Sequence, residues 1–315
     1  MADEVDHPEN FAYKLTDVTK KDQVQALVDL AIDKFGKLDV IYNNAGIMPQ
    51  GPVDDPNKLS EWQAILDTNI MGVLNGIVAA VPQMKKQGHG LIMATDSVAG
   101  HVVYPGSAVY NGSKYAVKAI MEGLRQEQHK NGIKTGVVSP GSVNTNLMST
   151  IHDDTIRKGI EDTSNSTKNG WLSSDDIAEL AVFMMSQPEN VDINEILMKQ
   201  QGQGLIMATD SVAGHVVYPN SAVYNGSKYA VKAIMEGLRQ EQHKNGIKTG
   251  IVSPGFVDTN LMDTINDDEI RNQIEAGKKG WLSPENIAEI AVFMMSQPEN
   301  VDINEILVRP TDQDV

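Results

Sequence analysis

The chain has 315 residues, of which 41% are hydrophobic and 22% are charged. This is the composition of a globular protein with one large domain or two small ones. The formal net charge of −16 argues against nucleic acids and anionic membranes as partners, because their phosphates would be repelled. The chain contains no cysteine, which excludes disulfides, thiolate nucleophiles and cysteine-ligated zinc.

The first part of the chain alternates predicted strands and helices. Thr19 has Asp22 three residues later and precedes an apolar pattern at helical spacing, which predicts a capped helix start. Gly36 is typical of the residue that follows a helix. The apolar stretch at 73–82 is too short to span a bilayer. The predicted elements are a strand at 11–15, a helix at 19–36, a strand at 38–42, a turn at 43–46 and a helix at 62–84.

Residues 84–197 occur a second time at 198–307, and these segments are named the first and the second repeat. No Gly/Ser-rich or Pro-rich linker separates them, and even a typically exposed residue such as Gln126 is identical in both. We infer a tandem duplication that is recent or an artefact of sequence assembly. Between 90 and 148 only four positions differ, namely Gly106/Asn220, Val137/Ile251, Ser142/Phe256 and Asn144/Asp258.

Each repeat predicts the same series of elements. In the first repeat these are strands at 91–95, 134–139 and 192–197 and helices at 108–131 and 173–188. Ser173 and Ser283 are predicted helix caps, and Pro284 occupies the favoured first helical position. Strands that alternate with helices indicate an α/β fold with a doubly wound parallel sheet. We expect two domains: 1–197, a truncated Rossmann-like domain that ends with the first repeat, and 198–315, which contains the second repeat.

Tyr110 and Lys114 are four residues apart at the start of a predicted helix, so they share one face. Ser97 lies just after a strand end, where open parallel sheets bind ligands. A lysine ammonium near a phenol favours the phenolate and makes tyrosine a usable general acid/base. By itself, however, a helical Tyr-x-x-x-Lys pair is more often an ordinary surface pair.

The surroundings of this pair favour catalysis. TDVT (16–19), NNAG (43–46), Asn69, TDSVAG (95–100), the Tyr110–Lys114 segment and PGSVNT (140–145) follow one another at suitable spacing. This set resembles the short-chain dehydrogenase/reductase family over nearly the whole chain, with the repeat counted twice. The ending INEILVRPT is similar to the branch that holds YdfG-type and uncharacterised bacterial oxidoreductases.

The resemblance implies a Rossmann-like fold and reduction of a small carbonyl, or oxidation of an alcohol, with NAD(H) or NADP(H), NADP being slightly favoured. It implies that Tyr110 is the acid/base, that Lys114 holds the nicotinamide ribose and lowers the tyrosine pKa, and that Ser97 orients the substrate. Asn69 would support a water relay through a main-chain kink. The implied cofactor-binding residues are Asp17, Val18, Asn43, Ala45, Gly46, Tyr110, Lys114, Pro140, Gly141 and Thr145; the second repeat offers Ser211, Tyr224 and Lys228 for catalysis and Pro254, Gly255 and Thr259 for the cofactor.

The sequence departs from the family pattern at its beginning. A first strand and a TGxxxGxG loop, whose backbone N–H groups bind pyrophosphate, would precede everything present here. We therefore expect an N-terminally truncated sheet with a duplicated C-terminal βαβαβ block. Three arrangements could compensate for the missing strands of the sheet. The strand at 11–15 could move beside the next strand, repeated strands could fill the gap in the sheet, or the two repeats could pack as an internal pseudo-dimer.

Three readings of function follow. The first is an NAD(P)-dependent oxidoreductase that uses the first-repeat residues, because they continue directly from NNAG and Asn69. The second is a catalytically inactive remnant, either a pseudoenzyme or an oligomer-interaction protein. The third is an active enzyme of which this chain is a truncated or misassembled form. We expect a cytoplasmic homo-oligomer or pseudo-dimer with a small-molecule substrate and no metal, because the seven histidines form no close ligand pair.

Overall fold

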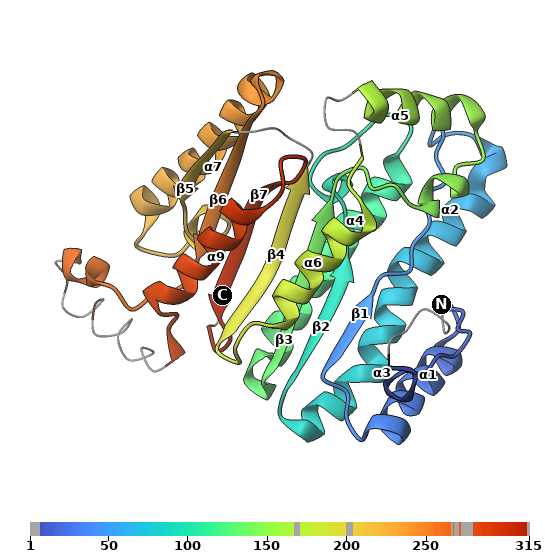
Figure 1. The fold of residues 1–315 in the computed structure, drawn as a ribbon, viewed down its shortest axis with the longest axis horizontal. Helices are drawn as coiled ribbons and strands as arrows, with labels where there is room; N and C mark the ends of the chain where they lie inside the picture. Colours follow the sequence, from blue (N-terminus) through green and yellow to red (C-terminus); the bar gives the residue numbers. More distant parts are fainter. Residues whose placement is uncertain are drawn as a thin grey trace. The chain divides into compact units, whose positions relative to one another are not determined.

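The computed structural model describes residues 7–166, 171–199, 204–265, 267, 271 and 280–313. The chain forms two compact units (Figure 1). The first unit comprises Met1–Lys134 and Asn146–Arg157, and the second comprises Thr135–Thr145 and Lys158–Val315. This division differs from the expected one at residue 197, because the last strand of the first repeat pairs with the last strand of the second repeat.

The first unit contains a parallel strand pair covered by helices. β1 (Val40–Asn43) pairs with β2 (Gly90–Thr95) from Val40↔Leu91 to Asn43↔Ala94. Helices α1 and α3 pack against each other, and α3 also contacts both strands, so that Val28, Ile77 and Met84 are buried. The principal elements of this unit are α1 (Lys21–Phe35), β1 (Val40–Asn43), α2 (Leu59–Ile65), the π-helix η4 (Leu66–Met71), α3 (Gly72–Gln87), β2 (Gly90–Thr95), the 3-10 turn η5 (Val98–Gly100) and α4 (Ala108–Gln128).

The continuous helical run Pro56–Gln87 is longer than the sequence predicts. By length and composition alone it could cross a membrane, and 44% of its most apolar window is buried inside the protein. Core helices of soluble proteins pass the same test, and here Val73, Ala80 and Met84 face the interior of the first unit.

Two predictions for the start of the chain are wrong. Residues 11–15 form no strand, and Tyr13 and Leu15 are largely exposed, because no neighbouring strand pairs with this segment among the described residues. The strand that was expected to move beside β1 is therefore absent from the described part of the chain. Helix α1 has Lys20 rather than Thr19 at its N-cap, because the backbone N–H and the hydroxyl of Thr19 both bind Asp17 Oδ1.

The second unit contains a five-stranded sheet in the order β3-β4-β7-β6-β5. Its strand pairs are parallel except for β4 and β7, which run antiparallel, so the predicted α/β fold is confirmed with a sheet that is mostly rather than wholly parallel. The elements that belong wholly or partly to this unit are β3 (Ile133–Pro140), α5 (Asp154–Ser166), α6 (Ser174–Met185), β4 (Val191–Lys199), β5 (Gly204–Thr209), η8 (Val212–Gly214), α7 (Ala222–Gln242), β6 (Ile247–Pro254), α9 (Pro284–Ser296) and β7 (Asp302–Pro310).

β4 and β7, yellow and red in Figure 1, are related by a local two-fold axis. Ile196 pairs with Ile306, its equivalent in the other repeat, and Glu195↔Leu307 mirrors Leu197↔Glu305. The following register shifts are symmetric as well, since Ile193↔Val308 mirrors Met198↔Ile303. Antiparallel pairing is the only arrangement in which two equivalent strands can meet about such an axis.

The predicted helix starts in the repeats are confirmed. Ser173 and Ser283 each accept a hydrogen bond from the third helical residue, which binds back to the cap backbone. Pro284 occupies the first position of α9, where its missing N–H costs nothing.

Candidate active site

The four predicted catalytic residues all lie in the first unit, beyond the carboxyl ends of β1 and β2. Tyr110 and Lys114 lie in the first two turns of α4, and Ser97 is the N-cap of η5. Ser97 Oγ accepts a hydrogen bond of 3.1 Å from the Ala99 N–H, which fixes the serine side chain. Asn69 lies in the π-helix η4.

Tyr110 is 5% exposed. Burial raises the pKa of its hydroxyl to about 12, the hydrogen bond with Ser97 lowers it, and the negative charge of Asp96 raises it. The pKa of Tyr110 is thus raised and not lowered as expected, because desolvation of the phenolate dominates. At neutral pH Tyr110 therefore keeps its proton and is a hydrogen-bond donor.

Lys114 is also buried. Its Nζ donates to the carbonyl oxygen of Thr95 at 2.7 Å and lies 5.8 Å from the centre of the Tyr110 ring. Burial lowers the pKa of Lys114 to about 8, and the Asp96 carboxylate opposes this shift. The ammonium is thus held close to the phenol, with its charge still present near neutral pH.

Asn69 ties the turn after β1 to α4. Its side chain exchanges two hydrogen bonds of 2.9 Å with the backbone of Ile47 and donates a third, of 3.1 Å, to Ser113 Oγ. Ser113 Oγ in turn donates to the Tyr110 carbonyl at 2.7 Å. A π-helical turn widens the helix around Asn69, and such bulges are frequent at functional sites.

The predicted cofactor residues of the first unit surround α3 and the NNAG turn. Val18 packs so closely on α3 that a Cβ at Gly72 would lie 2.9 Å from its side chain. Asn43 Nδ2 donates to the Met93 carbonyl at 3.2 Å, and Ala45 is exposed. A Cβ at Gly46 would come within 3.4 Å of Asn69 Oδ1. Asp17, whose pKa is lowered by its hydrogen bonds from Thr19, is at the surface.

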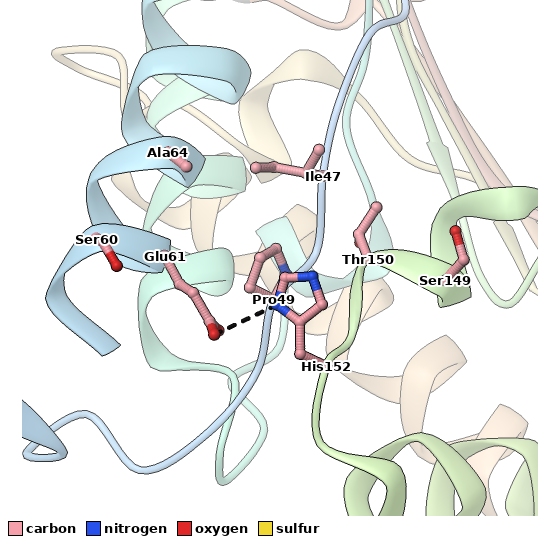
Figure 2. A pocket seen from close by; sticks show the side chains of 8 residues that line it. All are labelled: Ile47, Pro49, Ser60, Glu61, Ala64, Ser149, Thr150 and His152. Atoms are coloured by element: carbon pink, nitrogen blue, oxygen red, sulfur yellow. Dashed lines mark hydrogen bonds and ion pairs between the residues drawn. The ribbon is translucent and has the colours of Figure 1, made fainter. Parts of the chain in front are cut away.

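A cavity of about 330 Å³ lies beside this network (Figure 2). Ile47, whose backbone binds Asn69, lines it together with the start of α2 and the segment around Thr150. Thr150 Oγ1 accepts a hydrogen bond from the Met48 N–H at 2.8 Å, and His152 Nδ1 lies 3.3 Å from Glu61 Oε1. The lining residues are Ile47, Pro49, Ser60, Glu61, Ala64, Ser149, Thr150 and His152.

The second repeat reproduces part of the constellation in the second unit. Ser211 accepts from the Ala213 N–H at 3.1 Å, and Lys228 Nζ donates to the carbonyls of Thr209 and Asp210. Lys228 Nζ is 5.7 Å from the centre of the Tyr224 ring. Tyr224, however, is 41% exposed, because the second repeat has no counterpart of Asn69 or of the helix that carries it.

The predicted nicotinamide-binding turns belong to the second unit. Pro140 ends β3, the Gly141 N–H donates to the Met198 carbonyl at 2.8 Å, and Thr145 is exposed. In the second repeat Pro254 ends β6, and the Thr259 N–H donates to the Val257 carbonyl.

Gly255 lies beside the C-terminal tail of the chain. The Gln313 side chain lies where a Cβ of Gly255 would be and accepts a hydrogen bond from the Phe256 N–H. Thus the tail covers the turn of the second repeat.

Three residues that sequence reasoning passed over help to build the site. The Thr95 hydroxyl lies 2.8 Å from the Tyr42 hydroxyl and 2.7 Å from Asn44 Oδ1, while the Thr95 carbonyl holds Lys114. Asp96 is buried and affects both the tyrosine and the lysine. Ser113 links Asn69 to α4. The available signal was that Thr95 and Asp96 directly precede Ser97 at a strand end.

A potential metal-ligand group forms in the second unit although the sequence shows no such pattern. Ligand atoms of Asp210, His215 and Glu305 lie within 4.8 Å of one another. Lys232 Nζ is already 3.2 Å from Glu305 Oε2 and 3.1 Å from His215 Nδ1. The Lys232 ammonium therefore already provides a positive charge next to the Glu305 carboxylate.

Comparison with known proteins identifies relatives. The family model described as short chain dehydrogenase matches residues 1–156 and 161–270. An uncharacterised oxidoreductase of Staphylococcus saprophyticus is 45% identical over 199 residues, which cover 62% of this chain and 79% of that protein. An uncharacterised oxidoreductase of Listeria innocua is 43% identical over 182 residues, with 57% and 72% covered.

Two solved structures resemble the chain. ElxO with NADP bound has 27% sequence identity and a TM-score of 0.52, and the match covers 61% of this chain and 77% of that one. A short chain dehydrogenase/reductase from Burkholderia phymatum in complex with NAD has 27% identity and a TM-score of 0.50, with 58% and 68% covered.

Proposed function

The chain belongs to the short-chain dehydrogenase family, and from this premise we propose that its first unit reduces a small carbonyl compound, or oxidises the corresponding alcohol, with NAD(P)(H). The observation that carries the proposal is the convergence of Asn69, Ser97, Tyr110 and Lys114 beyond the ends of β1 and β2. Burial keeps the hydroxyl of Tyr110 protonated, as a general acid requires.

In the reduction direction, Tyr110 donates its hydroxyl proton to the carbonyl oxygen. Ser97 Oγ, held at the N-cap of η5, orients that oxygen by a hydrogen bond. When bound, NAD(P)H supplies the hydride that the carbonyl carbon receives. The C=O double bond becomes a single bond, and the product is an alcohol. The Lys114 ammonium stabilises the phenolate left on Tyr110, which recovers its proton from solvent through the polar side chains around Asn69.

The residues of the first unit fit the nicotinamide and ribose end of the cofactor. Lys114 carries the positive charge, and Ala45 of the NNAG turn is accessible. The pyrophosphate end has no glycine-rich loop among the described residues. Loss of several charge-assisted hydrogen bonds would weaken cofactor binding by several kcal/mol. ElxO binds NADP and the Burkholderia phymatum protein binds NAD, so both nucleotides are candidates, with NADP slightly favoured.

We place the part of the substrate that lies away from its carbonyl group in the cavity beside Ile47, since none of the four catalytic residues lines that cavity. Its volume of about 330 Å³ suits a small molecule, and Ile47, Pro49 and Ala64 give it apolar walls. Ser60, Ser149 and Thr150 supply hydroxyl groups that can bind a polar substituent. A small carbonyl compound with one apolar side matches this lining.

The test is a titration of the purified chain with NADPH and with NADH, followed by nucleotide fluorescence. Saturable binding in the micromolar range and nucleotide oxidation with a panel of small aldehydes and ketones would support the proposal. A lack of binding up to millimolar nucleotide would favour the second candidate, an inactive remnant.

A further inference from the structure

The second unit exposes a surface that is buried in the first unit, although the sequences are the same. β5 and β2 both read GLIMAT, and α7 and α4 are identical over their full length. Ile92 of β2 is fully buried, whereas its equivalent Ile206 is 41% exposed. Identical side chains are therefore covered in one unit and partly exposed in the other.

The first unit shows what this surface can bind. β1 pairs with the outer edge of β2, and α2 and η4 contact α4, where Asn69 donates to Ser113. β5 pairs only with β6 among the described strands, so its outer edge is open. The edge contains no charged residue and no proline, which are the usual devices that prevent pairing with another chain.

The helix beside this edge adds a hydrophobic face. Its members follow one another at alternating spacings of three and four residues, which is the pattern of helix-to-helix packing. Ser227 and Ile234 are exposed here, whereas their equivalents Ser113 and Ile120 are covered or partly covered. The face, named the α7 seam, consists of Tyr224, Ser227, Val231, Ile234 and Leu238.

We propose that the outer edge of β5 and the α7 seam form a two-fold interface with the same surface of a second copy of this chain. Each chain has one β1–α3 segment and two surfaces of this type, so exchange of that segment between chains would always leave one surface per chain open. Self-association covers the open surface on both chains at once. Strand edges pair antiparallel about a two-fold axis without any change in backbone conformation.

The chain offers a matched pair of variants. Ile234→Glu places a charge in the α7 seam, and Val292→Glu changes an equally apolar, 59% exposed residue of α9. We expect the wild-type chain to sediment as a concentration-dependent dimer. Ile234→Glu should raise the dimer dissociation constant by about 100-fold or more, and Val292→Glu should leave it unchanged. Both variants should retain the wild-type circular dichroism spectrum, since both side chains are exposed.

Covalent trapping provides a second readout. Because the chain has no cysteine, a single Val231→Cys substitution introduces its only thiol. Val231 is the central residue of the seam, so a two-fold interface brings both thiols close to the axis, and mild oxidation should yield a disulfide-linked dimer. Val292→Cys should form no disulfide-linked dimer under the same conditions. A wild-type chain that stays monomeric at high concentration, or a dimer dissociated by Val292→Glu but not by Ile234→Glu, would overturn the proposal.

Discussion

Phe183 of α6 and Phe293 of α9 stack face to face, with ring centroids 3.6 Å apart and planes inclined by only 6°. They are equivalent residues of the two repeats, as are Ile196 and Ile306, which pair in the sheet beneath them. The local two-fold axis of the second unit is therefore built in two layers, one of helices and one of strands. The two repeats therefore pack against each other through equivalent residues.

The aromatic stack makes a measurable contribution to stability. We expect Phe183→Ala and Phe293→Ala each to lower the free energy of unfolding, since each loses apolar contact and the stacking geometry. A double-mutant cycle should give a coupling energy of about 1 kcal/mol, the usual value for an aromatic pair. Denaturant unfolding of the four chains checks this, and a coupling energy near zero would show that the rings do not stack in solution.

Substitution of the two tyrosines separates the two repeats. Tyr110→Phe removes the proton donor and should lower carbonyl reduction by at least about 100-fold without loss of the fold. Tyr224→Phe is the matched control, because its sequence surroundings are identical and its hydroxyl lies at an exposed site. Steady-state rates of NADPH oxidation by the two variants measure this difference. If Tyr224→Phe alone abolished turnover, the catalytic repeat would have been assigned wrongly.

Reduction should depend on the ionisation of Lys114. The pKa of Lys114 is about 8, so the rate should be flat below that pH and fall about tenfold per pH unit above it, as the ammonium charge is lost. A pH profile of kcat/KM measures this dependence. A profile that stays flat well above pH 8 would contradict a role for this charge.

The same pKa has a consequence for stability. In the unfolded chain Lys114 titrates at its usual value of 10.5, so between about 8 and 10.5 the unfolded state binds more protons than the folded state. The contribution of Lys114 to the free energy of unfolding therefore rises with pH across that window. A comparison of wild type with Lys114→Met by chemical denaturation at several pH values isolates this contribution.

Asp96 should determine the pH at which the rate of reduction begins to fall. Its carboxylate raises the pKa values of both Lys114 and Tyr110, so Asp96→Asn should move the fall in rate to lower pH. Asp210→Asn, the same change in the second repeat, should leave the profile in place. Equal shifts in both variants would mean that neither aspartate acts locally on the site.

Asn69 should be important for the stability of the first unit as well as for its chemistry. Asn69→Ala leaves the Ile47 N–H and carbonyl without their buried partner and removes the hydrogen bond that Ser113 Oγ accepts, which should cost about 2–4 kcal/mol. Thermal unfolding measures this loss. A variant as stable as wild type would show that water replaces the side chain.

Local chemistry in the sequence predicted much of the fold. The caps at Ser173 and Ser283 and the helix boundary at Gly36 follow from interactions within a few residues, and they appear as predicted. The segment at 11–15 has a strand-like composition but no neighbour, and strands exist only through pairing. The antiparallel β4–β7 pair could not be predicted from the sequence either, because it depends on a symmetry between distant segments.

For the site as well, the sequence predicted which residues take part, whereas their environment depends on distant parts of the fold. Motif order indicated Tyr110 and Lys114, and the fold brings both residues beside Ser97 and Asn69. The pKa of Tyr110 could not be read from spacing, because it depends on how completely the surrounding chain removes water. The residues next to Tyr110 and Tyr224 along the chain are identical, so the sequence favoured Tyr110 only because the first repeat continues directly from NNAG and Asn69. Their difference arises from the α2–α3 helix, which only one of them has.

The pairing of β4 with β7 also changes how this contact responds to dilution. An interface between separate molecules dissociates when the protein is diluted below its dissociation constant. Here the paired strands belong to one polypeptide, and the linking chain holds them at an effective concentration that dilution cannot lower. The contact between the repeats should therefore persist at nanomolar protein, where an assembly of separate chains would dissociate.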